Sequence, residues 1–438
     1  MTTASLTESK ETSAGASLAG SQRLMSVDAL RGFDMFWIIG ADSLVYALNR
    51  MSKTPTTKFL AGELDHAEWA GFHFYDLIFP LFVFIVGVSL VFSLTKTIET
   101  GGRADALKRV FRRGVLLFLI GIFYSGGLTS AWPDIRLMGV LNRIALAYFF
   151  AGLLFCFFKP RALAGICVAL LAGYWALLTF LPIRNIQMTQ DNLAMLVEKQ
   201  GDKETAALFR EPGNPSAVKN SAVWATAQKM FYGTTDWVTG KFDEGLNVSD
   251  HFDFRYLPGR KYEVFADPEG LLSTIPAVAT CLLGVFAGLL LRNRSVPDAR
   301  KILLLVVFGV VGAALGWWWH SRFPVVKKIW TSSFVLVAGG YSALLLAAFY
   351  FIVDVWQKRA WCQPFVWMGM NSITVYLASN ILGGFRRIAP RLVGGNVRTF
   401  LDDHVAKGMG EMMISLVGLL LAFWFVHFLY KRRIFLRL

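Results

Sequence analysis

Residues 66–87 read HAEWAGFHFYDLIFPLFVFIVG, and this stretch decides how the chain folds. Its second half opens a continuous apolar run of the kind that crosses the roughly 30 Å hydrocarbon core of a bilayer. Its first half carries His66, His73 and Asp76, ionisable groups that an apolar helix serving only as an anchor does not need. The stretch therefore predicts a transmembrane helix with a polar site at its mouth.

The composition of the 438-residue chain places it among integral membrane proteins. Hydrophobic residues make up 55% of the chain and charged residues only 17%, whereas soluble domains carry about 25% charged residues. Apolar windows recur along the chain and predict an all-α polytopic bundle of about ten transmembrane helices. We expect these helices near 29–49, 74–95, 111–126, 138–158, 162–182, 271–291, 302–319, 329–353, 364–382 and 410–430.

The spacing of these helices divides the chain into four parts. Residues 1–22 are polar, lack the apolar segment of a signal peptide and predict a disordered tail. Residues 23–182 hold the first five helices and a loop at 50–73, and residues 269–438 hold the last five. Between them, residues 183–268 lose the apolar periodicity and predict one long, partly folded loop outside the membrane.

Lys and Arg residues are more frequent in the short loops on the side of the N-terminal tail than in those on the opposite side. Positive charge marks the cytoplasmic side of membrane proteins. We therefore expect both termini in the cytoplasm, and the region of His66 and the 183–268 loop outside it.

Several function classes are disfavoured by the sequence. The net charge of +14 is explained by cytoplasmic loops, so no nucleic-acid partner is predicted. No zinc spacing, P-loop, GxGxxG or GxSxG pattern occurs, so no metal site is predicted. The four cysteines lie in or beside apolar runs and read as small buried residues: Cys156, Cys167, Cys281 and Cys362.

Ionisable residues inside the first predicted helix are candidates for a functional site, because charge is expensive in a membrane. Asp28, Arg31 and Asp34 are spaced three apart, so Arg31 can pair with either carboxylate on one helix face. The cluster is either a charged group at the membrane surface or part of a site. Asp42 lies further along the same helix and is a second candidate.

Polar residues in two later helices also admit two interpretations. Asn142 and Arg143 lie one to two turns inside the predicted membrane region, where Arg143 can extend to the surface or face an anionic group. Ser372 and Tyr376 share one helix face, with Asn371 beside them. Such a stripe is either packing between helices or the lining of a substrate cavity.

Acidic residues also stand at the predicted outer mouths of two helices. Asp76 precedes a dry apolar run and needs a partner, for which a histidine is suited because a carboxylate fixes the tautomer of an imidazole. The residues alone do not choose between His66 and His73. Asp267 and Glu269, with Pro268 and Gly270, read as a tight turn entering the membrane before the helix at 271–291. Alternatively, the two carboxylates only cap the N-terminus of that helix.

Taken in order, these segments resemble the heparan-α-glucosaminide N-acetyltransferase family, within a wider set of transmembrane acyltransferases. The block HxxW followed by DLIFPxFVF is the most specific. The matching segments are RLMSVDALRGFDMF (23–36), HAEWAGFHFYDLIFPLFVFIVGVS (66–89), GVLNRIALAY (139–148), DPEGLLSTIPAVATCLLGVFAG (267–288), KKIWTSSFVL (327–336) and GMNSITVYL (369–377).

The resemblance implies a membrane enzyme that takes an acetyl group from cytoplasmic acetyl-CoA and passes it to a sugar amine across the membrane. The family's catalytic histidine, in the first extracytoplasmic loop, corresponds to His66 in the 50–73 loop, and its aspartate before the FP pair corresponds to Asp76. Asp42 stands where lysosomal members have Asn. A bacterial member in the inner membrane, acting on a glucosamine-type amino sugar, is the expected case.

Roles for the remaining candidates follow from this resemblance and from charge. At the cytoplasmic face, Arg109, Arg112 and Arg113, with Arg31 nearby, are expected to hold the phosphates of coenzyme A. Trp69 either stacks on a sugar face or belongs to the aromatic belt of the membrane surface. The residues expected to line the acceptor cavity are Asn142, Arg143, Asn371, Ser372 and Tyr376.

The residues leave the reaction route, the function class and the oligomeric state open. His66 can act as a general base for the acceptor amine or as a nucleophile that becomes acetylated. A permease for an amino sugar would carry the same polar stripes without acyl transfer. The small residues of GVFAGLLL (284–291) and GVVGAALG (309–316) allow tight packing within the chain or in a homodimer.

Overall fold

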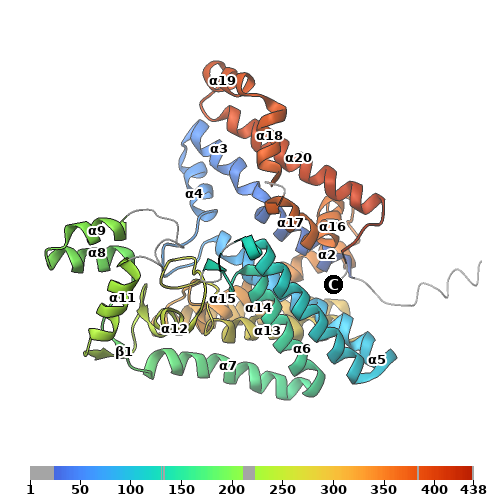
Figure 1. The fold of residues 1–438 in the computed structure, drawn as a ribbon. Coiled ribbons are helices and arrows are strands. Elements are labelled where there is room, and N and C mark those ends of the chain that lie inside the picture. The colour runs from blue at the N-terminus through green and yellow to red at the C-terminus, as the bar shows by residue number, and fades with distance from the viewer. Residues whose placement is uncertain (1–23, 130, 132–133, 211–221, 382–383, 437–438) are drawn as a thin grey trace, which may run out of the picture.

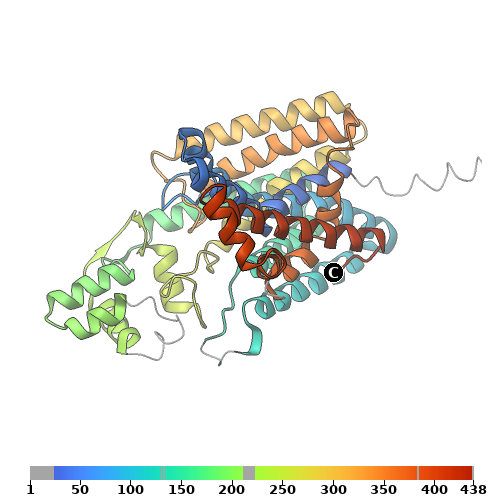
Figure 2. The same cartoon turned by 90° about the horizontal axis from the view of Figure 1, so that it is seen from above.

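The computed structural model describes residues 24–129, 131, 134–210, 222–381 and 384–436, and the predicted tail at 1–22 lies outside these ranges. Within them the chain is an all-α polytopic protein, as the composition predicts. Figures 1 and 2 show long helices packed into a bundle, with a smaller helical part projecting from one end. Strands in the described ranges are confined to two short antiparallel pairs in that smaller part.

Seven helices among the described residues are long and apolar enough to cross a membrane. They correspond to most of the expected spans. The difference from ten arises because two expected spans are joined into one helix and two others are broken into shorter helices. The seven are α5 (Phe74–Tyr124), α6 (Val140–Phe157), α7 (Pro160–Phe180), α13 (Thr274–Arg292), α14 (Asp298–Trp319), α15 (Ser332–Phe349) continued by the π-helical η4 (Tyr350–Val355), and α20 (Met409–Lys431).

The two spans expected at 74–95 and 111–126 are the two arms of the long helix α5. The arms meet at Gly102, whose φ of 81° is a backbone conformation that residues with a side chain rarely adopt. Because the chain turns at this glycine without losing helical residues on either side, the loop expected between the spans is reduced to a bend.

Two other expected spans are broken into shorter helices. The first consists of α2 (Met25–Phe36), the π-helical turn η1 (Trp37–Ala41) and α3 (Asp42–Ser52), with Gly40 at a φ of 122°. The ninth consists of α16 (Gln363–Met370) and α17 (Ser372–Ile381), which separate at Asn371. Broken helices leave backbone polar groups that are tolerated in a membrane only where they face protein or a cavity.

Glycines allow the central helices to approach closely. A Cβ atom added to Gly87 of α5 would lie 2.0 Å from the carbonyl oxygen of Cys281 in α13, and one added to Gly284 would lie 1.9 Å from that of Phe84. Gly309 of α14 meets Gly340 of α15 in a similar way. The small residues noted in the sequence therefore serve packing within this chain.

The segment at 183–268 forms the projecting part seen at the left of Figure 1. It has its own apolar core, which includes Leu193, Phe209 and Phe265, and its place outside the membrane stays a prediction. Its elements are β1 (Ile183–Arg184), α8 (Gln190–Lys199), α9 (Lys203–Arg210), α11 (Ala222–Gly233), β2 (Trp237–Val238), β3 (Phe242–Asp243), β4 (Leu246–Asn247) and α12 (Val248–Tyr256).

The remaining helices cover the bundle near the first span. Figure 1 places α3, α18 and α19 together at the end of α20, away from α7. The bounds of these smaller elements are α4 (Pro55–Glu63), η2 (Gly127–Thr129), α18 (Gly384–Val393) and α19 (Gly395–His404).

Candidate active site

The loop before α5 folds back so that His66 lies against the first turn of that helix. Its Nδ1 is 2.8 Å from Oδ1 of Asp76, and the other carboxylate oxygen accepts hydrogen bonds from the backbone N–H groups of Ala67 (3.1 Å) and His73 (3.0 Å). The Asp76 side chain is 1% exposed and that of His66 is 51% exposed. The histidine partner expected for Asp76 is present, and the side chain that fills this place is that of His66.

A lysine that the sequence reasoning did not single out completes this group. Lys327 lies in the connection between α14 and α15, with its Nζ 3.3 Å from Oδ1 of Asp76 and 3.0 and 3.3 Å from the two ring nitrogens of His66. Burial lowers the pKa of Lys327 below the usual value for lysine, while the Asp76 carboxylate opposes that change. Three ionisable side chains from two distant segments therefore share one contact region.

A small cavity of about 250 Å³ opens beside this group. His66, Tyr75, Glu269 and Lys327 contribute its polar groups on one side, and the ring centroid of Tyr75 is 5.0 Å from that of His66. The rest of the lining is largely apolar. An apolar wall that carries a small number of convergent polar groups is typical of a site that binds and orients a small molecule.

Glu269 is held in this cavity by a compact cluster of charges. The guanidinium of Arg136 donates to both oxygens of Asp267, at 2.9 and 2.8 Å, and to Oε2 of Glu269 at 2.7 Å. Burial, together with the neighbouring Asp267, raises the pKa of Glu269 above its usual value. The N–H of Gly270 donates to the carbonyl of Asp267 at 2.8 Å, which closes the expected tight turn. The alternative, a cap on α13, does not hold, because the two carboxylates bind this arginine and the N-cap residue is Ser273.

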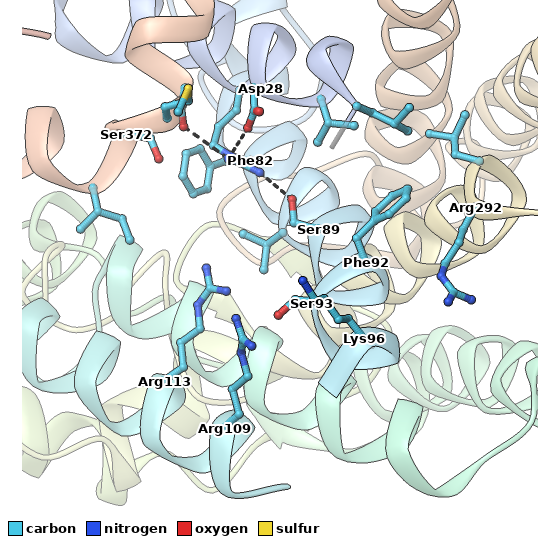
Figure 3. A pocket seen from close by; sticks show the side chains of 18 of the residues that line it. Asp28, Phe82, Ser89, Phe92, Ser93, Lys96, Arg109, Arg113, Arg292 and Ser372 are labelled. Carbon is cyan, nitrogen blue, oxygen red and sulfur yellow. Dashed lines mark hydrogen bonds and ion pairs between the residues drawn. The ribbon is translucent and has the colours of Figure 1, made fainter. Parts of the chain in front are cut away.

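A second and larger cavity, about 1340 Å³, lies at the other end of the same helices. It is strongly basic, and Figure 3 shows Arg109 and Arg113, from the second arm of α5, reaching toward Ser93 and Lys96 on the first arm. Six basic side chains line it against two acidic ones. They are Arg31, Lys96, Arg109, Arg113, Arg292 and Arg294, with Asp28 and Glu99.

Pairing leaves most of this positive charge available. Arg31 is paired with Asp28 at 3.2 Å, and Arg292 with Glu99 at 2.5 Å. Arg113 stacks on the ring of Tyr148 at 4.8 Å, and its buried Nε has no partner among the described residues. A cavity with unpaired guanidinium groups is suited to a phosphorylated ligand.

The two cavities meet inside the bundle. Five residues line both of them, and they are Phe82, Leu141, Ile144, Ser372 and Ile373. Arg292, at the end of α13, faces the large cavity, and Glu269, just before the start of this 19-residue helix, faces the small one. At 1.5 Å per residue the helix spans about 28 Å, so the cavities approach each other from opposite ends of the bundle.

Several of the predicted site residues line these cavities. Arg31, Arg113 and Asn371 face the large cavity, Tyr376 the small one, and Ser372 both. Tyr376 also stacks on Tyr124, with ring centroids 4.6 Å apart. The polar stripe of the ninth span is therefore cavity lining as well as packing.

Other predicted residues lie away from both cavities, which corrects the expected lining. Asn142 donates to the carbonyl of Phe118 at 2.9 Å. Arg143 is fully buried, bonded to Ser273 and stacked over the ring of Trp330 at 4.8 Å. Both side chains leave α6 toward neighbouring helices rather than toward the cavities.

Three further expectations are changed by the geometry. The indole N–H of Trp69 donates to the carbonyl of Phe242 at 2.7 Å, which fixes the ring against the projecting part formed by residues 183–268. Arg112 is exposed on α5 and does not line the large cavity, because its neighbour Arg113 takes the inward face. Asp42 lies in the first turn of α3, outside the lining of both cavities.

The pairing of the first helix is also settled. Arg31 contacts Asp28 and donates to Ser89 at 2.5 Å. Asp34 is fully buried, and neither of its carboxylate oxygens has a partner among the described residues. Within the described ranges, the pairing of Arg31 with Asp34 that the spacing allows is therefore absent.

Known proteins match this chain in the region of the site. The family described as heparan-alpha-glucosaminide N-acetyltransferase, catalytic, matches residues 23–198. Heparan-alpha-glucosaminide N-acetyltransferase of Homo sapiens is 29% identical over 342 residues, and that of Mus musculus 28% over 348, each covering 73% of this chain and 49% of the relative. The chain thus spans about half the length of the curated relatives it matches. These matches confirm the family resemblance inferred from the sequence.

Proposed function

From this family resemblance and the geometry of the two cavities, we propose that the protein is a membrane-embedded acetyltransferase. It transfers an acetyl group from acetyl-CoA, bound from the cytoplasmic side, to the amine of a glucosamine-type amino sugar that enters from the opposite side. The orientation rests on the Lys and Arg distribution, which puts both termini in the cytoplasm of an inner-membrane protein. The observation that carries the proposal is the meeting of a basic cavity with the cavity of His66.

The large cavity is suited to the nucleotide end of acetyl-CoA. Lys96, Arg109 and Arg113 supply positive charge that no carboxylate neutralises among the described residues, and phosphate groups bind such side chains through charge-assisted hydrogen bonds. The flexible pantetheine arm is narrow and mostly uncharged, so it can follow the shared lining toward His66. The charged nucleotide then stays on the cytoplasmic side while the thioester reaches the small cavity.

The chemistry at His66 follows from its hydrogen bond to Asp76. With the Nδ1 proton donated to Asp76, the lone pair of Nε2 is available. In direct transfer, the amine nitrogen attacks the thioester carbonyl carbon while Nε2 accepts a proton from that nitrogen. The C–S bond then breaks, the amide forms, and the coenzyme A thiolate takes the proton from Nε2.

A second route through the same atoms is attack by Nε2 itself. The acetyl group then moves to the imidazole with loss of the coenzyme A thiolate, and the sugar amine takes it from the imidazole in a later step. Asp76 stabilises the positive ring in either route. Ping-pong kinetics or an acetylated His66 trapped without acceptor would distinguish the second route from the first.

Passive passage of a sugar is disfavoured by the lining shared by the two cavities. Phe82, Leu141, Ile144 and Ile373 are apolar, and among the described residues Ser372 is the one polar side chain that both cavities share. A sugar crossing there would lose hydrogen bonds to water with little in exchange. A pantetheine arm has a smaller polar surface than a sugar. The apolar lining shared by the two cavities therefore favours acyl transfer over the transport of a sugar.

The test is acetyl transfer by the purified full-length chain in detergent. Radiolabelled acetyl-CoA and a panel of amino sugars would be supplied to the wild type, His66→Ala and His73→Ala. His73→Ala is the matched control, because this side chain contacts the carbonyl of Asp65 rather than the Asp76 carboxylate. We expect transfer by the wild type and the control and none by His66→Ala. A wild type that binds no coenzyme A and transfers no acetyl group would end the proposal.

A further inference from the structure

The connection between α14 and α15 holds Lys327 in a fixed place over His66. Two contacts join this connection to the loop before α5. Ala70 and Val326 form an isolated antiparallel β-bridge, and the N–H of Gly71 donates to the carbonyl of Val325 at 2.9 Å. The hydroxyl of Thr331 accepts from the N–H of Val326 at 3.0 Å and so closes the turn. Lys327 is therefore held in place by the backbone on both sides of it.

The ammonium of Lys327 uses the same carboxylate oxygen as His66. It lies 3.3 Å from Oδ1 of Asp76, while the Nδ1 atom of His66 lies 2.8 Å from that oxygen. It also lies 3.3 Å from Nε2, the atom on which the proposed chemistry depends. One negative charge is thus shared between a fixed cation and an imidazole.

This sharing matters because an unopposed carboxylate favours the charged form of a histidine. A protonated imidazole has no lone pair on Nε2, so it can neither accept a proton from an amine nor attack a thioester. Asp76 has to orient the ring of His66 without charging it. A second cation that offsets the carboxylate meets both requirements.

The other charged groups near His66 do not replace this cation. Glu269 is occupied by Arg136 at 2.7 Å, and Asp65 uses its carboxylate for the backbone N–H of His66 at 2.9 Å. Tyr75 and Tyr376 present uncharged phenols at neutral pH. Apart from His66 itself, Lys327 is the one basic side chain that lines the small cavity in the part of the chain that the structure describes.

We propose that Lys327 is a positioning residue of the reaction centre, whose ammonium shares Oδ1 of Asp76 with His66 and weakens the pull of that carboxylate on a proton at Nε2. The inference rests on the proposed function for its catalytic meaning. The physical claim, that Lys327 governs the protonation of His66, stands apart from acetyl transfer and can be measured alone.

The experiment is the rate at which diethyl pyrocarbonate modifies His66, followed by mass spectrometry of its peptide between pH 5 and 8. The reagent attacks only the unprotonated ring, and the half-exposed side chain of His66 is accessible to it. Wild type, Lys327→Met, Lys327→Arg and Lys328→Met would be compared as full-length protein in detergent. Lys328 is the matched control, because its ammonium pairs with Glu244 and Glu263, each at 2.7 Å.

We expect the pH at which the modification rate is half-maximal to rise by about one unit in Lys327→Met. A charged neighbour shifts a pKa by about one to three units, and the low end applies because solvent screens the half-exposed His66. Lys327→Arg and the control should keep the wild-type midpoint. In the background of Asp76→Asn the midpoint should start lower than in the wild type, and Lys327→Met should still raise it, because the ammonium lies 3.3 Å from Nε2 whether or not the carboxylate is charged. If Lys327→Met does not fold, Lys327→Gln removes the charge and keeps a hydrogen-bonding group.

An unchanged midpoint in a folded Lys327→Met or Lys327→Gln protein would overturn the inference, even with the enzyme active. A wild type that transfers no acetyl group would instead defeat the proposed function and leave this measurement valid. In an active enzyme, the acid limb of the pH–rate profile should move upward with the midpoint. At a pH well below both midpoints, kcat should fall about tenfold, the equivalent of one pH unit, while KM for acetyl-CoA stays unchanged.

Discussion

Replacing Asp76 with asparagine tests the reaction centre most directly, because the carboxylate accepts from four donors. Oδ1 faces Nδ1 of His66 and Nζ of Lys327, and Oδ2 faces the backbone N–H groups of Ala67 and His73. An asparagine offers one oxygen, which accepts, and one NH2 group, which donates. The NH2 group must therefore face either the two side-chain donors or the two backbone donors, and that pair loses its acceptor. The change keeps the side-chain volume and removes both the charge and half of the accepting capacity.

The cost can be estimated for the orientation in which the amide oxygen keeps the two backbone hydrogen bonds. The NH2 group then points at His66, which accepts on Nδ1 and carries its proton on Nε2, the wrong tautomer for catalysis. The same change in a catalytic triad lowers kcat by about 10⁴-fold. Loss of two charge-assisted hydrogen bonds at about 1.5 kcal/mol each gives about 10²-fold. We therefore expect kcat for acetyl transfer to fall between about 10² and 10⁴-fold.

The assay is the initial rate of acetyl transfer with saturating acetyl-CoA, beside the dissociation constant for coenzyme A. Coenzyme A binding should not change, because the basic cavity is lined by Ser93, Lys96, Arg109 and Arg113 around the bend of α5, away from Asp76 at its start. Asp65→Asn is the control, since Asp65 is exposed and contacts only the backbone N–H of His66 through its side chain. An Asp76→Asn enzyme with kcat within threefold of the wild type would refute the reasoning about tautomer and charge.

Three further outcomes follow from the structure. Arg113→Gln should raise the Kd for coenzyme A about tenfold, by loss of one charge-assisted phosphate contact, while Arg112→Gln leaves the Kd unchanged. Equal effects of the two changes in equilibrium binding would contradict the assignment of Arg113, rather than Arg112, to the lining of the large cavity. Gly87→Ala should lower the melting temperature in detergent, because its Cβ would lie 2.0 Å from a carbonyl oxygen of α13, whereas Gly165→Ala meets nothing within 4 Å and should not. Burial raises the pKa of Asp253 to about 7, so the folded extramembrane part binds a proton that the unfolded chain releases near pH 4. Its contribution to stability is full below about pH 4 and is lost as the pH rises through 7. The hydrogen-exchange protection factor of α12, corrected for the intrinsic exchange rate, should therefore be lower at pH 8 than at pH 6. The absence of this difference, or its persistence in Asp253→Asn, would count against the assignment.

The sequence was sufficient for the class of protein and for the pair at its centre. Apolar windows, their lengths and the polar gap at 183–268 predict the bundle and its projecting part, because burial in lipid imposes one composition along a whole helix. Asp76 was found because it stands before a dry apolar run and needs a partner, and the family resemblance assigned that place to His66. The residue pattern left His73 as a second possible partner, and the fold of the loop decided between them.

The sequence could not show which face of each helix meets a cavity. Arg112 and Arg113 are neighbours in a basic run, yet only Arg113 lines the large cavity. Asn142 and Arg143 have the composition of site residues, and the rotation of α6 directs them into packing contacts instead. A rotation of 100° between successive helical residues separates such neighbours, and packing against other helices sets that rotation.

Tertiary structure alone decided the remaining parts of the site. Lys327 lies 251 positions beyond Asp76 in the chain, and no local pattern marks it as a partner, although it stands in a segment that carries the family resemblance. Glu269 reads as a helix cap until Arg136 is brought to it. Hydropathy, turns and short motifs are local properties and follow from the residues in order. A contact between distant segments depends on how all the helices pack together, so the reaction centre was visible only in the folded chain.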